Sequence, residues 1–413
     1  MNPSLPHLFK CPTLLTFFLA LIPLVSGPLL RGAQASDNPK DPTSYSKTDF
    51  TALSDWIDKK RTEYNLPGMA VAVVCRDEVL MIKSYGFCDL EKKKPINEHT
   101  VFPIGSSAKP FTSTLAAVLV SKGLMHWDDP ITKYLPYFEL NIKTDDPSDQ
   151  VTIRDLLSHR TGFFHMEIIQ KAINWQEDPT FAERPEAERY TRKSLLEEAA
   201  GYEPVDCFRK KHNYSNVSML AAAMAAGQAA GKDWDTVIEE MIFKPMGMNH
   251  SSTSITRIHG DHEVAGGHLL EDAGYRPAML INMDVISPAG GINASASDMT
   301  HWLRCLLCDG KYEGKRLIRT EALHELWKVQ IEKADMGGMF PGAAYGLGWF
   351  ITEWNGHKVV EHGGNALGYS ANIALIPELG IGYAMLSNAL PNPLQVTLSE
   401  KIWETLGVGK DGD

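Results

Sequence analysis

The sequence predicts an α+β fold with three α/β/α-like layers. One antiparallel sheet is built from both ends of the chain and flanked by helices. β-rich runs occupy residues 68–90 and recur at 345–390, whereas the residues between them carry mostly helical patterns. Strands at both ends of a sequence with helices between them indicate a single sheet assembled from both ends. The middle of the chain, about 125–310, then forms a helical lobe, and we expect the functional site in the cleft between lobe and sheet.

The composition is that of a globular protein with a large core. The chain has 413 residues, of which 44 % are hydrophobic and 22 % are charged, and its formal net charge is −11. The only basic block is RKKH at 209–212. An acidic chain of this kind is a poor candidate for binding a phosphate backbone, so we expect no nucleic-acid partner. The oligomeric state stays open.

The first 35 residues are predicted to be a secretory signal peptide. Lys10 lies in a short polar stretch, and the apolar run TLLTFFLALIPLVSGPLL that follows is broken by two prolines. A membrane anchor is the alternative, but the uninterrupted apolar run is short for a span. We expect cleavage near Ala35, export to the periplasm or the medium, and no stable membrane span. Residues 36–48 are expected to be disordered.

The first folded elements follow from apolar spacing and turn signals. Residues 49–65 form a short amphipathic helix, and two β-rich runs around a polar RDE turn form a hairpin at 68–90. A helical pattern starts at Ser106 and ends at Gly123. The stretch VTIRDLLSHRTGF opens another helix, for which Thr152 is the expected N-cap.

The middle of the chain is expected to be helical. Residues 163–211 are polar and helix-rich, whereas NVSMLAAAMAAGQAAG is a small-residue helix that must be buried on nearly all sides. The stretch DWDTVIEEMIFKPMGM forms a helix that stops at Pro245, because proline lacks a backbone N–H. A further helix, SASDMTHWLRCLL, has Ser295 or Ser297 as its cap.

The last part of the chain changes character. Short strands are separated by NG, GGNALG and ELG turns, and a final helix is expected at about 392–406. No internal repeat or long linker divides the sequence. We therefore expect one domain at 49–408, followed by a short tail at 409–413.

The cysteines and histidines do not form a recognisable metal motif. Cys305 and Cys308 form a CxxC on an apolar helical segment, which favours core packing over a zinc site. The histidines of HGDHEVAGGH fall in a glycine-rich segment, for which we expect a surface loop rather than a metal site. Apart from Cys11 in the signal peptide, an odd number of cysteines remains, so their pairing stays open. These are Cys75, Cys88, Cys207, Cys305 and Cys308.

The stretch FPIGSSAKPFTS, residues 102–113, contains a possible activated nucleophile. Ser106 and Lys109 are three residues apart, so on a helix they share a face and the amine can reach the hydroxyl. At the start of a helix the serine also faces the positive end of the dipole. Ser107 is only two residues from Lys109 and points elsewhere. Pro110 is tolerable there, because amides of the first turn have no helical partner.

Context separates this match from a decoy. Ser44 and Lys47 have the same spacing, but they fall in the segment that we expect to be disordered. Two further elements follow Ser106 in the chain: Tyr214-Ser215-Asn216, directly before the small-residue helix, and His362-Gly363-Gly364, at the end of a strand. No GxSxG elbow is present, so an α/β-hydrolase arrangement has no support.

The ordered set of Ser-x-x-Lys, Tyr-x-Asn and Lys/His-x-Gly resembles the signature of the penicillin-recognising serine hydrolases. The most similar branch contains class C β-lactamases, D-Ala-D-Ala carboxypeptidases and related esterases. The resemblance covers roughly residues 50–407 and includes the blocks TIRDLLSHRTGF, FKPMGM, SPAGGINASASDM and HGGNALGYSA. It implies a secreted serine hydrolase that acts on a small-molecule or peptide substrate with an acyl group. It also implies that no metal or organic cofactor is needed.

The resemblance implies catalytic roles for three residues. Ser106 would attack a carbonyl group and form an acyl-enzyme, which water would then hydrolyse. Lys109 would lower the energy of the alkoxide and help to move protons. Tyr214 would be the general base or share that role with Lys109, and a Lys109 cation would favour the phenolate.

The resemblance also implies substrate contacts. Asn216 would orient Lys109 and hydrogen-bond a substrate amide. The backbone N–H groups of Ser106 and Asn365 would form the oxyanion hole, and Gly363 and Gly364 would leave room for the substrate beside the strand.

Two features depart from the β-lactamase pattern. His362 stands where the well-known β-lactamases have lysine, and a largely neutral histidine binds a carboxylated β-lactam less well. Amidase, peptidase or esterase activity therefore gains weight, although a true β-lactamase and a non-hydrolytic sensor of penicillin or cell-wall peptides stay as alternatives. The cluster of Arg209, Lys210 and Lys211 either attracts an acidic substrate or belongs to a solvated loop. For His159, in LLSHRTG, we expect a structural role.

Overall fold

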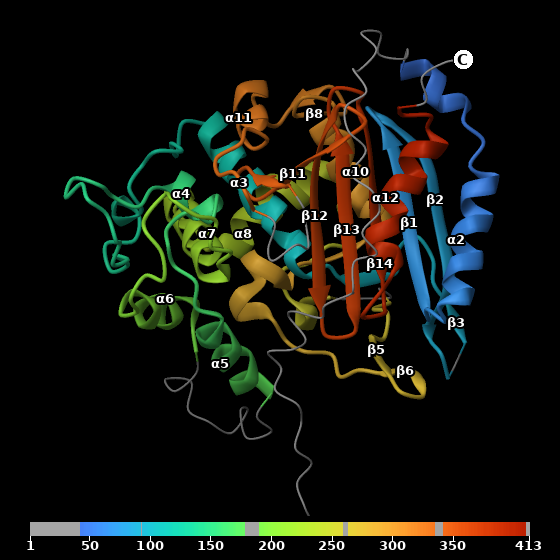
Figure 1. The fold of residues 1–413 in the computed structure, drawn as a ribbon, viewed down its shortest axis with the longest axis horizontal. Coiled ribbons are helices and arrows are strands. Elements are labelled where there is room, and N and C mark those ends of the chain that lie inside the picture. Colours follow the sequence, from blue (N-terminus) through green and yellow to red (C-terminus); the bar gives the residue numbers. More distant parts are fainter. Residues whose placement is uncertain (1–41, 92, 178–189, 259–262, 335–341, 410–413) are drawn as a thin grey trace, which may run out of the picture.

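The computed structural model describes residues 42–91, 93–177, 190–258, 263–334 and 342–409. The central sheet is covered on one face by α2 (Thr51–Glu63) and α12 (Leu394–Thr405), and on the other by α10 (Ala296–Leu307) and the helical lobe (Figure 1). The predicted α+β fold with a layered sheet and a helical lobe is therefore confirmed. The predicted signal peptide, 1–35, lies outside the described residues.

The sheet has eight antiparallel strands in the order β10-β11-β12-β13-β14-β1-β2-β3. Strand β1 pairs with β14 on one side and β2 on the other, so the two ends of the chain meet in the middle of the sheet, as predicted. The strands are β1 Gly68–Cys75, β2 Glu78–Asp89, β3 Lys94–Pro95, β10 Ala344–Tyr345, β11 Phe350–Trp354, β12 His357–Ala366, β13 Tyr369–Ile376 and β14 Ile381–Ser387. Three small two-stranded sheets join β4 Val101–Pro103 to β7 Asn293–Ser295, β5 His268–Glu271 to β6 Gly274–Pro277, and β8 Lys311–Tyr312 to β9 Lys315–Arg316.

Both faces of β1 are buried, because alternate residues point into two different cores. Met69, Val71 and Val73 pack in the cluster beneath α2 and α12, whereas Ala70 and Val74 belong to the core that includes α10 and the helical lobe. A strand covered on both faces reads as a continuous apolar run instead of an alternating one. This explains the sequence GMAVAVVC.

The helical lobe is organised around α7 (Asn216–Ala230), which packs against α3, α4, α6 and α8. Its many alanines let these helices approach closely, and most of its residues are buried, as the sequence predicted. The remaining α-helices are α3 Lys109–Ser121, α4 Ile153–Leu157, α5 Met166–Glu177, α6 Arg192–Ala200, α8 Trp234–Ile238, α9 Lys244–Met246 and α11 Thr320–Glu325. Shorter turns are the 3-10 helices η1 Pro42–Lys47, η2 Gly105–Ala108, η3 Ile131–Lys133, η7 Ile255–Arg257 and η8 Asp284–Ile286, and the π-helical η6 Glu239–Phe243 and η9 Ser287–Gly291.

Two sequence predictions about local structure are wrong. The disorder expected for 36–48 does not hold for residues 42–47, which form η1, because Tyr45 is buried in the cluster beneath α2. The helix expected to stop at Pro245 instead continues through η6 into α9 and ends before Gly247, which has a φ of 71°. Pro245 lies inside this continuous helical segment and removes one backbone donor from it, whereas the left-handed Gly247 is a common kind of helix end.

Helix caps and one cysteine follow the predictions. Thr152 caps α4 by accepting a hydrogen bond from the backbone N–H of Asp155, and Ser295 caps α10. Cys305, on α10, is fully buried in the core, as predicted for the CxxC, whereas Cys308 at the end of that helix is only partly buried. None of the helices in the described ranges combines the length and the apolar character that a membrane crossing requires.

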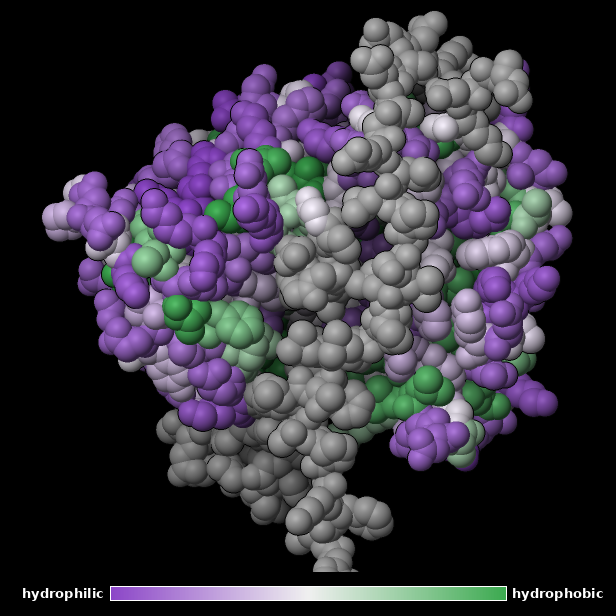
Figure 2. Space-filling view, viewed as in Figure 1, coloured by the Kyte–Doolittle hydropathy of each residue, from purple (hydrophilic) through white to green (hydrophobic). Residues whose placement is uncertain are grey.

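The surface is mainly hydrophilic over the helical lobe and over α2 (Figure 2). A smaller hydrophobic group lies near the β5–β6 hairpin in the same view. There the side chains of Leu270, Met279 and Leu280 are exposed. This distribution fits a folded domain whose apolar residues are mostly in its two cores.

An aromatic stack connects α3 to α10 and to the chain before β11. The Phe111 and Trp302 rings are stacked with centroids 4.0 Å apart, and the Trp302 and Trp349 rings are stacked at 5.7 Å. All three side chains are buried. Because α3 directly follows η2, the turn that carries Ser106, this stack holds the helix next to the serine.

We expect Trp302→Ala to lower the free energy of unfolding by about 3–5 kcal/mol, because it removes a buried aromatic side chain and leaves a cavity. Urea denaturation followed by circular dichroism measures the change. Val396→Ala is the matched control, because Val396 on α12 is 51 % exposed, and it should change the free energy by less than about 0.5 kcal/mol. Equal effects of the two substitutions would contradict the role of the stack.

Candidate active site

The Ser106 turn lies against an open edge of strand β12. Strand β11 pairs with β12 only as far as Glu361, so residues 362–366 pair with β13 on one side and face η2 on the other. The approach is very close, because a Cβ added to Gly364 would lie 1.9 Å from the carbonyl oxygen of Ile104. Only glycine fits at this position, so the close packing explains why the predicted motif has glycine at residue 364.

Ser106 and Lys109 are in hydrogen-bonding contact. The Nζ atom of Lys109 lies 3.0 Å from Oγ of Ser106 and also donates to the carbonyl oxygen of Ala289 at 2.8 Å. Lys109 is fully buried, whereas Ser106 is partly exposed. Burial lowers the pKa of Lys109 well below its usual value, which favours the neutral, proton-accepting form of the amine.

Tyr214 lies on the loop before α7 and covers the lysine. The Lys109 Nζ atom is 4.5 Å from the centroid of the Tyr214 ring. Burial raises the pKa of Tyr214 above its usual value, and a hydrogen bond with Ser106 only partly opposes this. The expectation that a Lys109 cation would favour a phenolate is therefore not supported, because burial moves both groups toward their neutral forms.

The neighbouring Ser107 faces away from Lys109, as its spacing predicted. Its hydroxyl is buried and donates to the carbonyl oxygen of His362 at 3.0 Å. This hydrogen bond ties η2 to the open edge of β12. Sequence reasoning did not anticipate this contact, because nothing in the sequence places residue 107 beside residue 362.

The two segments predicted to supply the oxyanion hole are in direct contact. A Cβ added to Gly105 would lie 2.6 Å from the backbone nitrogen of Asn365. Gly105 has a φ of 54°, so the turn before Ser106 also favours glycine for its conformation. Ser106 and Asn365 are both partly exposed, which leaves room for a substrate oxygen beside them.

Asn216 does not make the contact with Lys109 that we expected. Its Oδ1 atom is buried and has no hydrogen-bond partner among the described residues, while the lysine bonds to Ala289 instead. Asn216 is the first residue of α7, and the cap formed by Ser215 with the N–H of Ser218 fixes its position. Within the described ranges, no donor of the protein satisfies this buried acceptor.

His362 is buried, and both of its ring nitrogens have partners. Nδ1 lies 2.7 Å from the carbonyl oxygen of Gly363, and Nε2 lies 3.1 Å from the hydroxyl of Tyr345. A carbonyl only accepts, so Nδ1 donates and the Tyr345 hydroxyl donates to Nε2. Burial, together with the nearby Lys109, lowers the pKa of His362 to about 3. A neutral imidazole in this arrangement has no nitrogen left for a substrate carboxylate.

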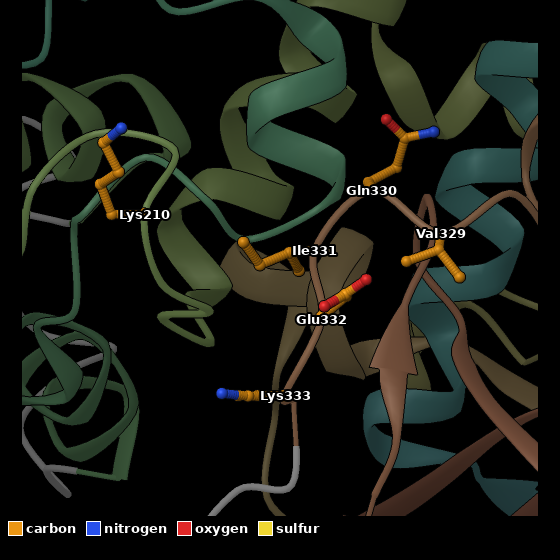
Figure 3. Close-up of a pocket in the computed structure, with 6 residues that line it drawn as sticks. All are labelled: Lys210, Val329, Gln330, Ile331, Glu332 and Lys333. Atoms are coloured by element: carbon orange, nitrogen blue, oxygen red, sulfur yellow. The ribbon is translucent and has the colours of Figure 1, made fainter.

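Most of the basic cluster at 209–211 is neutralised by acidic partners. Arg209 binds Asp155 at 2.9 Å and Asp149 at 3.1 Å, and Lys211 binds Asp206 at 2.6 Å. Lys210 instead lines a hollow of about 440 Å³. Figure 3 shows Lys210 on the loop before α7 and residues 329–333 on the segment after α11. An attraction of acidic substrates by the whole cluster is therefore not supported.

The described residues contain no group of three or more histidine, cysteine or carboxylate side chains able to hold a metal ion. His268 is not in a surface loop as expected, because it lies in β5, where it is buried and its Nδ1 donates to the carbonyl oxygen of Asn388 at 3.1 Å. The other two histidines of that glycine-rich stretch, His259 and His262, lie outside the described residues.

Comparison with known proteins gives one family. Residues 53–406 match the family model described as Beta-lactamase. "Unguisins hydrolase ungD'" of Aspergillus campestris is 27 % identical over 334 residues, which are 79 % of this chain and 59 % of that protein. "Protein flp" of Staphylococcus aureus is 24 % identical over 325 residues, 78 % of this chain and 60 % of that protein. The chain thus spans about 60 % of the length of these two relatives.

A bacterial relative is covered more fully. A protein named "Beta-lactamase" of Escherichia coli is 22 % identical over 379 residues, which are 83 % of this chain and 90 % of that protein. Among solved structures, the octameric penicillin-binding protein homologue of Pyrococcus abyssi has a TM-score of 0.74 at 24 % identity, over 87 % of this chain and 78 % of that chain. A class C beta-lactamase has a TM-score of 0.68 at 19 % identity, over 88 % and 97 %. These structures share the fold.

We expect His362→Gln to reduce the loss of stability on acidification. The pKa of His362 is about 3 in the folded protein and about 6.5 when unfolded. The neutral side chain therefore stabilises the fold fully above pH ~6.5, and this contribution is lost as the pH falls toward ~3. One such group contributes a slope of up to about 1.4 kcal/mol per pH unit. Urea denaturation at several pH values between these limits measures it.

His126→Gln is the control for that experiment, because the His126 side chain is exposed. This variant should keep the pH dependence of the wild type. The same slope in the wild type and in His362→Gln would contradict a buried neutral His362.

Proposed function

Because this chain belongs to the beta-lactamase family, a fold family of serine hydrolases, we propose that it is a secreted serine hydrolase that forms an acyl-enzyme at Ser106 and acts on an amide or ester. The observation that carries the proposal is the 3.0 Å contact between Ser106 Oγ and the buried amine of Lys109. This contact lies beside the open edge of β12, where a substrate carbonyl can enter. Secretion rests on the signal-like first 35 residues.

The acylation step uses the neutral groups of the site. Ser106 Oγ attacks the carbonyl carbon while its proton passes to the neutral Nζ of Lys109. The negative charge that develops on the carbonyl oxygen is stabilised by the backbone N–H groups of Ser106 and Asn365. The neutral phenol of Tyr214 then donates a proton to the leaving amine or alcohol as the bond to the carbonyl carbon breaks.

Deacylation repeats these steps with water. A water molecule attacks the Ser106 ester while its proton passes to the phenolate of Tyr214, and the ester bond to Oγ then breaks as Lys109 returns its proton to Oγ, so that the serine hydroxyl and both neutral groups are restored. The free Oδ1 of Asn216 is well suited to accept a hydrogen bond from a substrate amide N–H. No metal or organic cofactor enters either step.

His362 favours amides and esters over carboxylated β-lactams as substrates. A lysine at this position would offer a constant cation, whereas His362 is held neutral with both nitrogens occupied. The relatives do not identify the substrate of this chain, because one is named an unguisins hydrolase and another is named a beta-lactamase. A true β-lactamase is the second candidate, and a sensor that is acylated without turnover is the third.

The first experiment measures turnover of nitrocefin, p-nitrophenyl acetate and a peptide ending in D-Ala-D-Ala. We expect hydrolysis of the ester or the peptide, little hydrolysis of nitrocefin, and loss of activity in Ser106→Ala. Ser44→Ala, in the second Ser-x-x-Lys match, should keep the wild-type rate. Equal rates of wild type and Ser106→Ala would contradict the proposal, whereas labelling of Ser106 without turnover would indicate the sensor.

We expect Lys109→Met and Tyr214→Phe each to lower kcat by about 10²- to 10⁴-fold, because each removes a group that transfers a proton. KM should change much less, since neither substitution removes a substrate contact. Steady-state kinetics with p-nitrophenyl acetate measure both constants. Wild-type kcat in either variant would remove that residue from the mechanism, and circular dichroism checks that the variants are folded.

A further inference from the structure

His159 accepts hydrogen bonds from the backbone N–H groups of both residues that flank Tyr214. The backbone N–H of Asn213 donates to the carbonyl oxygen of His159 at 2.7 Å, and the backbone N–H of Ser215 donates to its Nδ1 atom at 3.2 Å. The backbone N–H of Arg209, earlier in the same loop, donates to the carbonyl oxygen of Arg160, the residue after His159. The segment that follows α4 thus holds the loop that carries Tyr214 in place through these hydrogen bonds.

The imidazole ring also contacts the tyrosine ring directly. The centroids of the His159 and Tyr214 rings are 4.6 Å apart, and the centroids of the His159 and Tyr345 rings are 5.0 Å apart. His159 is fully buried. Its ring therefore contacts both the tyrosine that covers Lys109 and the tyrosine that bonds to His362.

The hydrogen bonds determine which form of His159 is present. Because Nδ1 accepts from Ser215, the proton of the neutral ring is on Nε2. Burial, and then the nearby groups His212, Lys109 and His362, lowers the pKa of His159 well below its usual value, so the ring stays neutral. Nε2 is buried and has no hydrogen-bond partner in the part of the chain that the structure describes.

The burial of His159 would lower the free energy of unfolding if its only role were to stabilise the fold. A buried N–H without a partner destabilises a protein by about 1–3 kcal/mol. An apolar side chain would avoid that cost, but it would leave the Ser215 N–H without its acceptor. Ser215 follows Tyr214 directly and is the N-cap of α7, which begins at Asn216. The hydrogen bond of its N–H with His159 therefore fixes the positions of both Tyr214 and Asn216.

We propose that His159 is a positioning residue that orients the Tyr214 phenol toward Ser106 and Lys109 through its hydrogen bond with the Ser215 N–H and its ring contact with Tyr214. The inference rests on the proposed function, because it concerns the efficiency of the same acyl transfer. His159 does not touch the reacting atoms, and its effect reaches them through Tyr214.

The backbone of His159 suggests two informative substitutions. Its φ is 56°, in the left-handed region that asparagine and glycine adopt at low cost. In His159→Asn the Oδ1 atom stands near the position of Nδ1 and can accept from Ser215. In His159→Gly both the acceptor and the ring are lost without backbone strain. Glu313→Gly, at an exposed turn residue with a φ of 47°, is the control for glycine itself.

The test measures kcat and KM for p-nitrophenyl acetate and the rate of Ser106 labelling by a fluorophosphonate probe. We expect His159→Gly to lower kcat and the labelling rate about 10- to 100-fold, the scale of a small misplacement of a catalytic group, with KM nearly unchanged. His159→Asn should recover most of the loss, and Glu313→Gly should match the wild type. Circular dichroism confirms that each variant is folded at the assay temperature.

A double-mutant cycle separates positioning from a general structural role. In a Tyr214→Phe background, His159→Gly should cause little further loss of kcat, because the hydroxyl that it orients is already absent. Wild-type kcat in His159→Gly, or equal losses with and without the Tyr214 hydroxyl, would overturn the inference. Activity that survives Ser106→Ala would instead overturn the proposed function, so the two failures are distinguishable.

Discussion

The candidate site depends on the burial of one amine. Lys109 has no exposed surface, and two oxygens, Ser106 Oγ and the carbonyl of Ala289, lie within hydrogen-bonding distance of its Nζ. Removing a cation from water costs much free energy, so the neutral amine is favoured. Helix α3, the π-turn η9 and the loop with Tyr214 must converge to enclose it. The core that holds these three segments together therefore also maintains the proton acceptor.

The second constraint is the close approach of η2 to β12. Glycine at 364 lets the strand edge come within contact distance of the turn, and the hydroxyl of Ser107 donates across the gap to His362. The two adjacent serines thus have different surroundings. Ser106 faces the buried amine and remains partly exposed, whereas Ser107 is buried and connects the serine-bearing turn to the sheet.

The ionisable side chains around the Ser106 hydroxyl favour their neutral forms. Burial favours the neutral forms of Lys109, Tyr214, His159 and His362, which surround or support it. A network of charged groups contacts the loop that carries Tyr214. In it, the buried carboxylate of Asp155 binds Arg160 at 2.6 Å and Arg209 at 2.9 Å. That network fixes the loop that carries Tyr214, and the low dielectric around the neutral groups strengthens each hydrogen bond of the site.

The sequence by itself determined the layered α+β fold and the order of most of its elements, because apolar periodicity and turn residues are local signals. It also determined which serine faces Lys109, since a spacing of three residues sets that geometry on a helix. Only the tertiary structure decided the η1 turn, the burial that favours the neutral forms of Lys109 and Tyr214, and the partners Ala289, Tyr345 and His159. Burial and contacts between distant segments create these features, and no local pattern encodes how deeply a side chain will be buried or which carbonyl will face it.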